Sequence, residues 1–201
     1  MLKGSKLTRR TALALATAAL ALPSLKSRAA EVTERVIGEP DAPVTIIEYA
    51  SLTCPHCASF HRDVLPGLKE RYIDTGKVKL VFRDFPLDQV ALRAAVVAHC
   101  GGPARYGQFL DVLFENQERW AHAEDPVAAL KQIASLAGLS GEQVDACLAD
   151  EQMIDAVLQS RLDAQQEYDV RSTPTFVIDG KVYPGGRDVE AFAEIIEPLL
   201  R

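Results

Sequence analysis

The residues of this sequence whose types and spacing best suit chemistry are the two cysteines of Cys54-Pro55-His56-Cys57. An apolar, β-branched run precedes Cys54 and a helical pattern follows it, which places this thiol at a helix N-terminus. Free backbone N–H groups and the helix dipole stabilise the thiolate there, and the thiolate is the nucleophile of disulfide exchange. Cys57 lies one helical turn on. The pair predicts thiol–disulfide exchange, in which an exposed Cys54 reacts and a more buried Cys57 resolves the mixed disulfide.

The two residues between the cysteines fit the same chemistry. Pro55 occupies the first helical turn, where the missing N–H of proline is not needed. His56 is expected to donate a hydrogen bond to the sulfur of Cys54, or to place positive charge beside it. Stabilising the reduced thiolate makes the disulfide a stronger oxidant.

Two other uses of the motif fit the sequence less well. Cys54, His56 and Cys57 could form a metal site with distant His99 and Cys100, but no second Cys-x-x-Cys or spaced His pair completes a zinc pattern. A purely structural bridge is disfavoured because closing so short a loop gains little chain entropy. We therefore expect redox chemistry, without a metal or another cofactor.

The motif is flanked by a βαβ pattern. Residues Val44–Tyr49 are β-branched and apolar, bounded by Pro43, and predict a buried strand. A helical pattern runs from the motif to about Tyr72, and Val78–Phe85 predicts a second strand. Strand, helix and strand within about forty residues make one βαβ unit.

The middle of the chain, about residues 88–168, has a helical pattern almost throughout. Gly101-Gly102 ends a first helix, Asp125-Pro126 is an N-cap followed by proline, and Ser140 with Gln143 is a capping box. Four or five helices fit this stretch.

Strand signals resume at Thr175–Ile178, followed by Asp179-Gly180 and a further apolar run, Lys181–Tyr183. Asp-Gly between apolar runs is a strong hairpin signal. Asp188 is placed to cap a final helix to Leu200. The outline is βαβ, helical insertion, ββα, an α/β fold in which both halves contribute to one sheet.

Two motifs together resemble a known family: Cys54-Pro55-His56-Cys57 after the strand that ends at Glu48-Tyr49, and Ser172-Thr173-Pro174-Thr175 entering a later strand. The sequence is similar to the DsbA-type thiol:disulfide oxidoreductases of the thioredoxin superfamily. The likeness covers roughly residues 43–200 and implies a thioredoxin fold with an inserted all-helical block.

The resemblance implies a role for each matching residue. It makes Cys54 the nucleophile, Cys57 the resolving cysteine and His56 the residue that stabilises the reduced thiolate. Pro174 matches a cis-proline that faces the disulfide, and the preceding Thr173 a residue that contacts the substrate backbone.

Glu48, six residues before Cys54, matches a buried acid that accepts the proton of the buried cysteine. The alternative for Glu48 is an ordinary salt bridge at a strand end. A threonine before this proline, as at Thr173, also resembles the disulfide isomerases, whereas many strong oxidants have an apolar residue at that position. The direction of electron flow therefore stays open.

Cys100 and Cys147 both lie in the helical block. They are either a second disulfide or two buried, unpaired thiols. A bridge of this kind is found in some members of the family, and closing a loop of about 48 residues would contribute up to about 4 kcal/mol.

The remaining histidines and aromatic residues are expected to have structural roles. His61 and His122 are expected to be solvated or to cap helices, and His99 to pack on a helix. Packing is also expected for Trp120 and for five phenylalanines at core-like spacings, Phe60, Phe82, Phe85, Phe109 and Phe114.

The N-terminus has the pattern of an export signal. An apolar stretch from Ala12 to Leu22 follows four basic residues and is, at eleven residues, too short to span a membrane as a helix. Small residues at Ser27 and Ala29 favour cleavage after residue 29, leaving 30–201 as the mature domain. Residues 8–13 (Thr-Arg-Arg-Thr-Ala-Leu) resemble a twin-arginine signal, so either that route or Sec is open.

Charge limits the partners. Beyond residue 29 the chain has 16 basic and 28 acidic side chains, which disfavours nucleic acid. The leading hypothesis is a soluble, monomeric periplasmic oxidase that donates its disulfide to reduced secreted proteins. The resemblance implies reoxidation by a DsbB-like, quinone-linked membrane partner. The alternatives are a reductase or isomerase kept reduced by a membrane reductant, and a non-catalytic peptide-binding or metal-carrying module of the same fold.

Overall fold

The computed structural model describes residue 32 and residues 34–201, so the predicted signal peptide lies outside the described part. Five strands form one mixed sheet in the order β1-β3-β2-β4-β5. Their bounds are β1 (Arg35–Ile37), β2 (Val44–Ala50), β3 (Val78–Asp84), β4 (Thr175–Ile178) and β5 (Lys181–Pro184). Within the described residues, no helix has the length and apolarity needed to cross a membrane.

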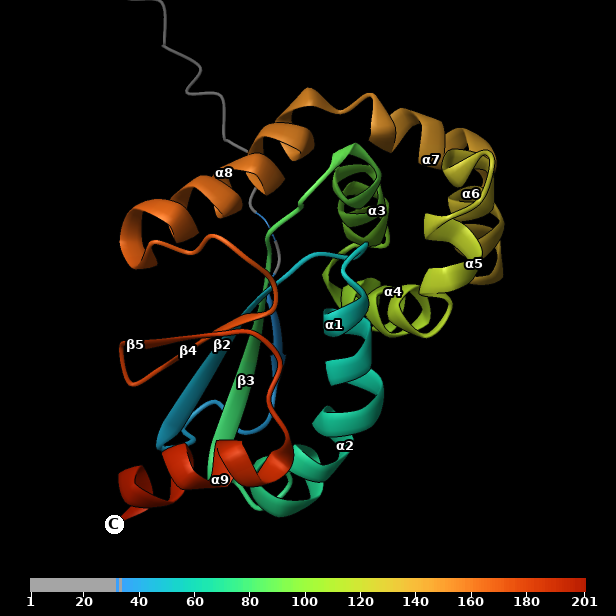
Figure 1. Cartoon of the computed structure of the whole chain (residues 1–201). Helices are drawn as coiled ribbons and strands as arrows, with labels where there is room; N and C mark the ends of the chain where they lie inside the picture. Colours follow the sequence, from blue (N-terminus) through green and yellow to red (C-terminus); the bar gives the residue numbers. More distant parts are fainter. Residues whose placement is uncertain (1–31, 33) are drawn as a thin grey trace, which may run out of the picture.

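The centre of the sheet is the predicted βαβ unit. β2 and β3 pair in parallel, with Val44 opposite Val78 and Glu48 opposite Phe82. β4 pairs antiparallel with β2 on the other side. Helices cover both faces (Figure 1), so alternate residues of β2 are buried against different layers.

The edge strand β1 was not predicted. Arg35–Ile37, which precedes the first predicted strand, pairs antiparallel with β3. Only three residues take part and Val36 between them is 50% exposed, so there is no alternating run long enough to signal a strand.

The helical run after the motif extends as far as predicted but is not uniform. α1 (Pro55–Ser59) and α2 (Leu65–Leu68) alternate with π-helical turns at residues 60–64 and 69–73. Pro66 has no N–H to bond the carbonyl four residues earlier, which explains the wide turn just before it. This run packs with α9 (Val189–Ile196) on one face of the sheet, in a core that includes Phe60, Phe176 and Phe192.

The insertion contains six helices, not four or five. They are α3 (Gln89–Cys100), α4 (Pro103–Glu115), α5 (Gln117–Ala121), α6 (Pro126–Leu136), α7 (Gly141–Leu148) and α8 (Glu151–Tyr168). The Asp125 cap and the Ser140–Gln143 capping box are both present. The count was too low because α5 is a single short turn between longer helices.

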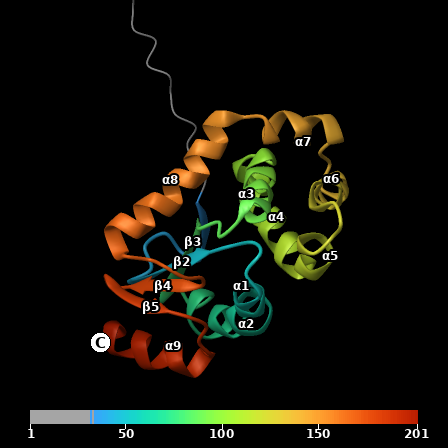
Figure 2. The ribbon, with the colours of Figure 1, turned by 45° about the horizontal axis from the view of Figure 1, so that its top comes forward.

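α3 to α7 gather beside the sheet as a helical lobe, and the long α8 returns from this lobe to the sheet (Figure 2). The lobe has its own core, which includes Trp120, Phe109 and Phe114 and extends to Cys54 and Cys57. The five phenylalanines and Trp120 are all buried, as predicted.

The C-terminal half follows its sequence signals closely. Asp179 and Gly180 have φ angles of 50° and 71°, as a two-residue hairpin turn requires, and they join β4 to β5. Asp188 caps α9 by accepting a hydrogen bond from the backbone N–H of Ala191, and a 3-10 turn (Glu197–Leu200) follows.

Candidate active site

The motif cysteines lie where β2 ends and α1 begins. Cys54 is the N-cap of α1, and both thiols are free rather than bonded to each other. The prediction of an exposed Cys54 was wrong: it is 6% exposed and Cys57 0%. Both belong to the core that continues into the helical lobe, so the insertion covers the start of α1.

The environment of Cys54 favours its thiolate. Its pKa is lowered from 9.0 to about 5, chiefly by a hydrogen bond from the Cys57 thiol. Burial opposes this effect, while the Thr173 side chain and the backbone N–H groups of Cys57 and His56 add to it. The two backbone N–H groups are the free amides that the helix N-terminus was expected to supply.

Cys57 has the opposite bias. Burial raises the pKa of its thiol far above the ordinary value, and the hydrogen bond to Cys54 and the negative charge of Glu48 raise it further. The reduced pair therefore carries one thiolate, on Cys54, and one proton, on Cys57.

His56 contributes through its backbone. Its side chain and that of Pro55 are exposed, and the structure gives no hydrogen bond from the His56 imidazole to sulfur among the described residues. The predicted side-chain donation is therefore absent in this structure, and the effect on Cys54 comes from the His56 amide.

Thr173 and Pro174 face the reactive cysteine from a distant part of the chain. The bond between them is cis, and Cys54 Sγ lies 3.3 Å from the Thr173 carbonyl oxygen, to which the thiol donates when it is protonated. Within the described residues the buried Thr173 hydroxyl has no other hydrogen-bond partner. The two predicted motifs thus form one site.

Glu48 is fully buried on β2 and is paired with His61, a histidine for which no role in the site was predicted. Its Oε2 lies 2.9 Å from Nε2 of His61, whose side chain is only 6% exposed. The expectation of a solvated or capping His61 was wrong, because its ring is enclosed by Phe60, Phe82 and Phe114. His122, by contrast, is exposed and His99 is packed, as expected; His99 also bonds Asp84, which was not predicted.

Gln117, at the start of α5, was missed by the sequence analysis. Its buried side-chain amide donates to the carbonyls of Leu52 at 2.7 Å and Cys54 at 3.0 Å. A residue of the helical lobe therefore holds the loop that carries the nucleophile. No local pattern indicates this contact, since more than sixty residues separate the partners.

Cys100 and Cys147 meet away from this site. Their sulfurs lie 2.02 Å apart, at bonding distance, and join the end of α3 to α7. Among the described residues, no three His, Cys, Asp or Glu side chains gather as metal ligands would.

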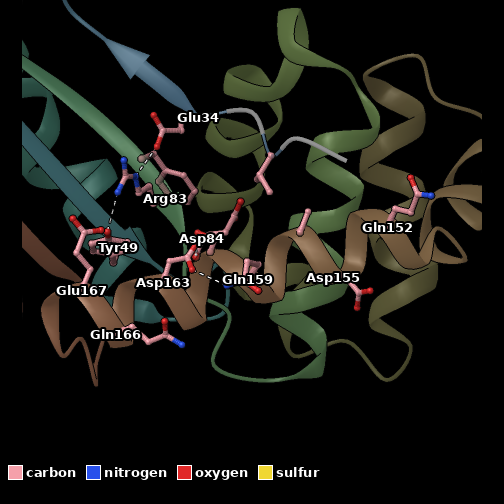
Figure 3. Close-up of a pocket in the computed structure, with 14 residues that line it drawn as sticks. Glu34, Tyr49, Arg83, Asp84, Gln152, Asp155, Gln159, Asp163, Gln166 and Glu167 are labelled. Carbon is pink, nitrogen blue, oxygen red and sulfur yellow. Dashed lines mark hydrogen bonds and ion pairs between the residues drawn. The ribbon is translucent and has the colours of Figure 1, made fainter. Parts of the chain in front are cut away.

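A separate hollow of about 900 Å³ lies between α8 and the sheet (Figure 3). Arg83 spans its end, bonding Glu34 at 2.6 Å and the Tyr49 hydroxyl at 3.0 Å. None of the predicted site residues lines it, so it is not part of the cysteine site.

Known proteins are similar to this chain in both fold and sequence. The family described as thioredoxin matches residues 30–198. A putative protein-disulfide oxidoreductase of Rickettsia typhi is 32% identical over 148 residues, which are 73% of this chain and 55% of that protein. Disulfide bond formation protein D of Bacillus subtilis is 27% identical over 184 residues, 89% of this chain and 80% of that one.

Solved structures agree. The crystal structure of Wolbachia pipientis alpha-DsbA1 is 34% identical, covers 83% of this chain and 90% of its own, and superposes with a TM-score of 0.74. Oxidised BdbD from Bacillus subtilis covers 82% and 91% at 27% identity, with a TM-score of 0.72. Fold and cysteine site together define a thioredoxin-like redox protein. The chain belongs to the thioredoxin family, and to its DsbA-type members.

Proposed function

We propose that this protein is a thiol:disulfide oxidoreductase that donates a Cys54–Cys57 disulfide to reduced secreted proteins. The carrying observation is the asymmetry of the pair: the pKa of Cys54 is lowered to about 5 while burial raises that of Cys57. A stable Cys54 thiolate makes the reduced enzyme the favoured product, which is the property of an oxidant.

The reaction follows from that asymmetry. A substrate thiolate attacks Cys54 Sγ, the Cys54–Cys57 bond breaks, and its electron pair leaves on Cys57, which takes up a proton. A second substrate thiolate then attacks the substrate sulfur of the mixed disulfide and releases Cys54 as a thiolate. Two electrons pass to the enzyme, and the two substrate thiols lose two protons, of which Cys57 retains one.

The other residues act around these two sulfurs. Thr173 and Pro174 line the approach to Cys54 and are proposed to align the substrate backbone there. Glu48 is proposed to exchange the proton of Cys57, on which its charge already acts. Cys100 and Cys147 are proposed to brace the helical lobe without taking part in exchange.

The cellular setting is inferred from the sequence and the family. Residues 1–29 are proposed to direct export to the periplasm, where the protein acts as a monomer. A DsbB-like membrane oxidase linked to quinones would restore the disulfide. A role as reductase or isomerase on the same fold is the second candidate, favoured only by Thr173 before the cis-proline.

The deciding experiment is the reduction potential of Cys54–Cys57 in a glutathione series, together with oxidation of a reduced, unfolded model protein. We expect a potential well above about −270 mV, the value of thioredoxin, and substrate oxidation that stops in Cys54→Ser. A potential at or below that value would assign the protein to the reductants.

A further inference from the structure

The buried pair of Glu48 and His61 is unusual in its surroundings. Glu48 is 0% exposed, and its second oxygen, Oε1, has no hydrogen-bond partner among the described residues. The Nδ1 atom of His61 is likewise buried and without a partner there. An uncompensated charge at such a place is costly, so the two groups depend on each other.

Aromatic rings fix the imidazole. His61 stacks on Phe114 of α4 with ring centres 4.2 Å apart, and it meets Phe82 of β3 edge-on at 6.0 Å. The ring therefore cannot turn away from Glu48 without breaking its packing. Phe114 belongs to the insertion, so the lobe holds this histidine as well as the nucleophile loop.

Among the described contacts of the His61 ring, Glu48 is the single titratable group. From β3 and α4 the contacts are phenylalanines, and from its own helical run Phe60. The adjacent charges, Arg62 and Asp63, bond each other at the surface. Beyond Glu48 the next titratable group is Cys57, on which the Glu48 charge acts.

We propose that His61 is a positioning residue for the exchange reaction: it holds the Glu48 carboxyl beside Cys57 and shares with it the proton that Cys57 gains and loses. This rests on the proposed function. When the Cys54–Cys57 bond opens, the pair gives one proton to the Cys57 thiolate and is left with one negative charge. A proton released by the substrate thiols restores it. On reoxidation the pair releases one proton to solvent and takes up the proton that Cys57 loses as its sulfur attacks the mixed disulfide on Cys54.

The test is the rate at which Cys57 resolves a Cys54–glutathione mixed disulfide, measured by rapid mixing from pH 5 to pH 9. Proton transfer by a placed side chain is worth about 10²-fold or more. We expect His61→Gln, which keeps a donor but cannot titrate, to slow resolution at pH 7 by about that factor. The remaining rate should rise tenfold per pH unit, as for deprotonation by hydroxide. Glu48→Gln should behave alike, and the double variant should lose no more.

The chain offers a matched control. His99 and Asp84 are a second buried pair, 2.8 Å apart, in the helical lobe and at the end of β3. His99→Gln should keep the rate and pH profile of the parent protein, whatever it does to stability. Cys54 thiolate absorbance near 240 nm should be unchanged in both histidine variants.

Three results would overturn the proposal. One is a parental rate and profile in His61→Gln; another is an equal loss in His99→Gln; the third is a loss in Glu48→Gln alone. If His61→Gln does not fold, ¹⁵N-histidine NMR of the parent protein replaces it: the His61 ring nitrogens should shift between the oxidised and reduced states while those of His99 stay fixed. Equal shifts of the His61 and His99 ring nitrogens would refute the proposed role of His61. Failure of the oxidase function itself would appear separately, as no substrate oxidation by the parent protein.

Discussion

Lowering the pH should destabilise the reduced protein in part through the Cys54 thiolate. In the folded chain the pKa of Cys54 is about 5, against 9.0 for an ordinary thiol. A group whose pKa is lowered on folding stabilises the folded state above its unfolded pKa, and this stabilisation disappears as the pH falls through the folded value. The affected window therefore runs from pH 9 down to about pH 5.

The size of the effect follows from those two values. Each pH unit above the folded pKa adds about 1.4 kcal/mol until the unfolded thiol ionises too. At pH 7 the thiolate then contributes about 3 kcal/mol to the free energy of unfolding, and nearly none at pH 4. Cys57 adds nothing to this change because burial keeps it protonated throughout.

Urea unfolding of the reduced protein at pH 7 and pH 4, with a phosphine reductant present, measures it. Cys54→Ser is the reference because it retains every carboxylate and loses only the titrating sulfur. We expect the parent protein to lose about 3 kcal/mol more than Cys54→Ser between the two pH values. Equal losses would show that Cys54 is an ordinary thiol and would remove the basis of the oxidant proposal.

The same thiolate predicts a redox titration. Reduction by glutathione releases one proton above pH 5, where Cys54 is ionised, and none below it. The equilibrium constant with glutathione should therefore rise tenfold per pH unit from pH 5 to about pH 7.5 and be flat below pH 5. A constant that is flat over the whole range would contradict the lowered pKa.

Three further changes have distinct expected outcomes. His56→Pro deletes a backbone N–H that stabilises the Cys54 thiolate. It should raise the pKa of Cys54, measured by absorbance near 240 nm, more than His56→Ser does, and should also lower the reduction potential more. Gln117→Leu should lower the free energy of unfolding by about 3 kcal/mol because two buried carbonyls lose their donor, whereas Gln159→Leu, which removes an exposed bond to Asp163, should be near neutral. The double variant Cys100→Ala/Cys147→Ala should keep substrate oxidation but melt at a lower temperature, because its free energy of unfolding falls by up to about 4 kcal/mol. Loss of oxidation while the variant is still folded would instead indicate a relay role.

Local chemistry made much of the site predictable. Cys54 and Cys57 stand together in sequence, and a proline after Thr173 at a strand start is an equally local mark. What failed was exposure: Cys54 was expected at the surface because it begins a helix. A local pattern does not show what covers a helix end, and here the helical lobe does.

The burial of His61 could have been predicted from the sequence. It follows Cys57 by four residues, so the two share one face of a helix, and the face of a buried cysteine is buried. The residue was overlooked because histidine is often solvated, and because its partner Glu48 lies on a strand. Gln117 had no such sign, since its role depends on how α5 packs.

The insertion is therefore better understood as part of the active site than as an addition to the fold. Gln117 from α5 holds the carbonyls of Leu52 and Cys54, while Phe114 from α4 stacks on His61. The lobe thus acts on both cysteines, at Cys54 through a bond to its backbone carbonyl and at Cys57 through His61 and Glu48. Because it also buries them, water is excluded where charge must be placed, and each hydrogen bond there has more effect on a pKa than it would at a surface. The sheet supplies the helix N-terminus and the cis-proline, and the helical lobe supplies the low-polarity surroundings that separate the two thiols into a thiolate and an acid.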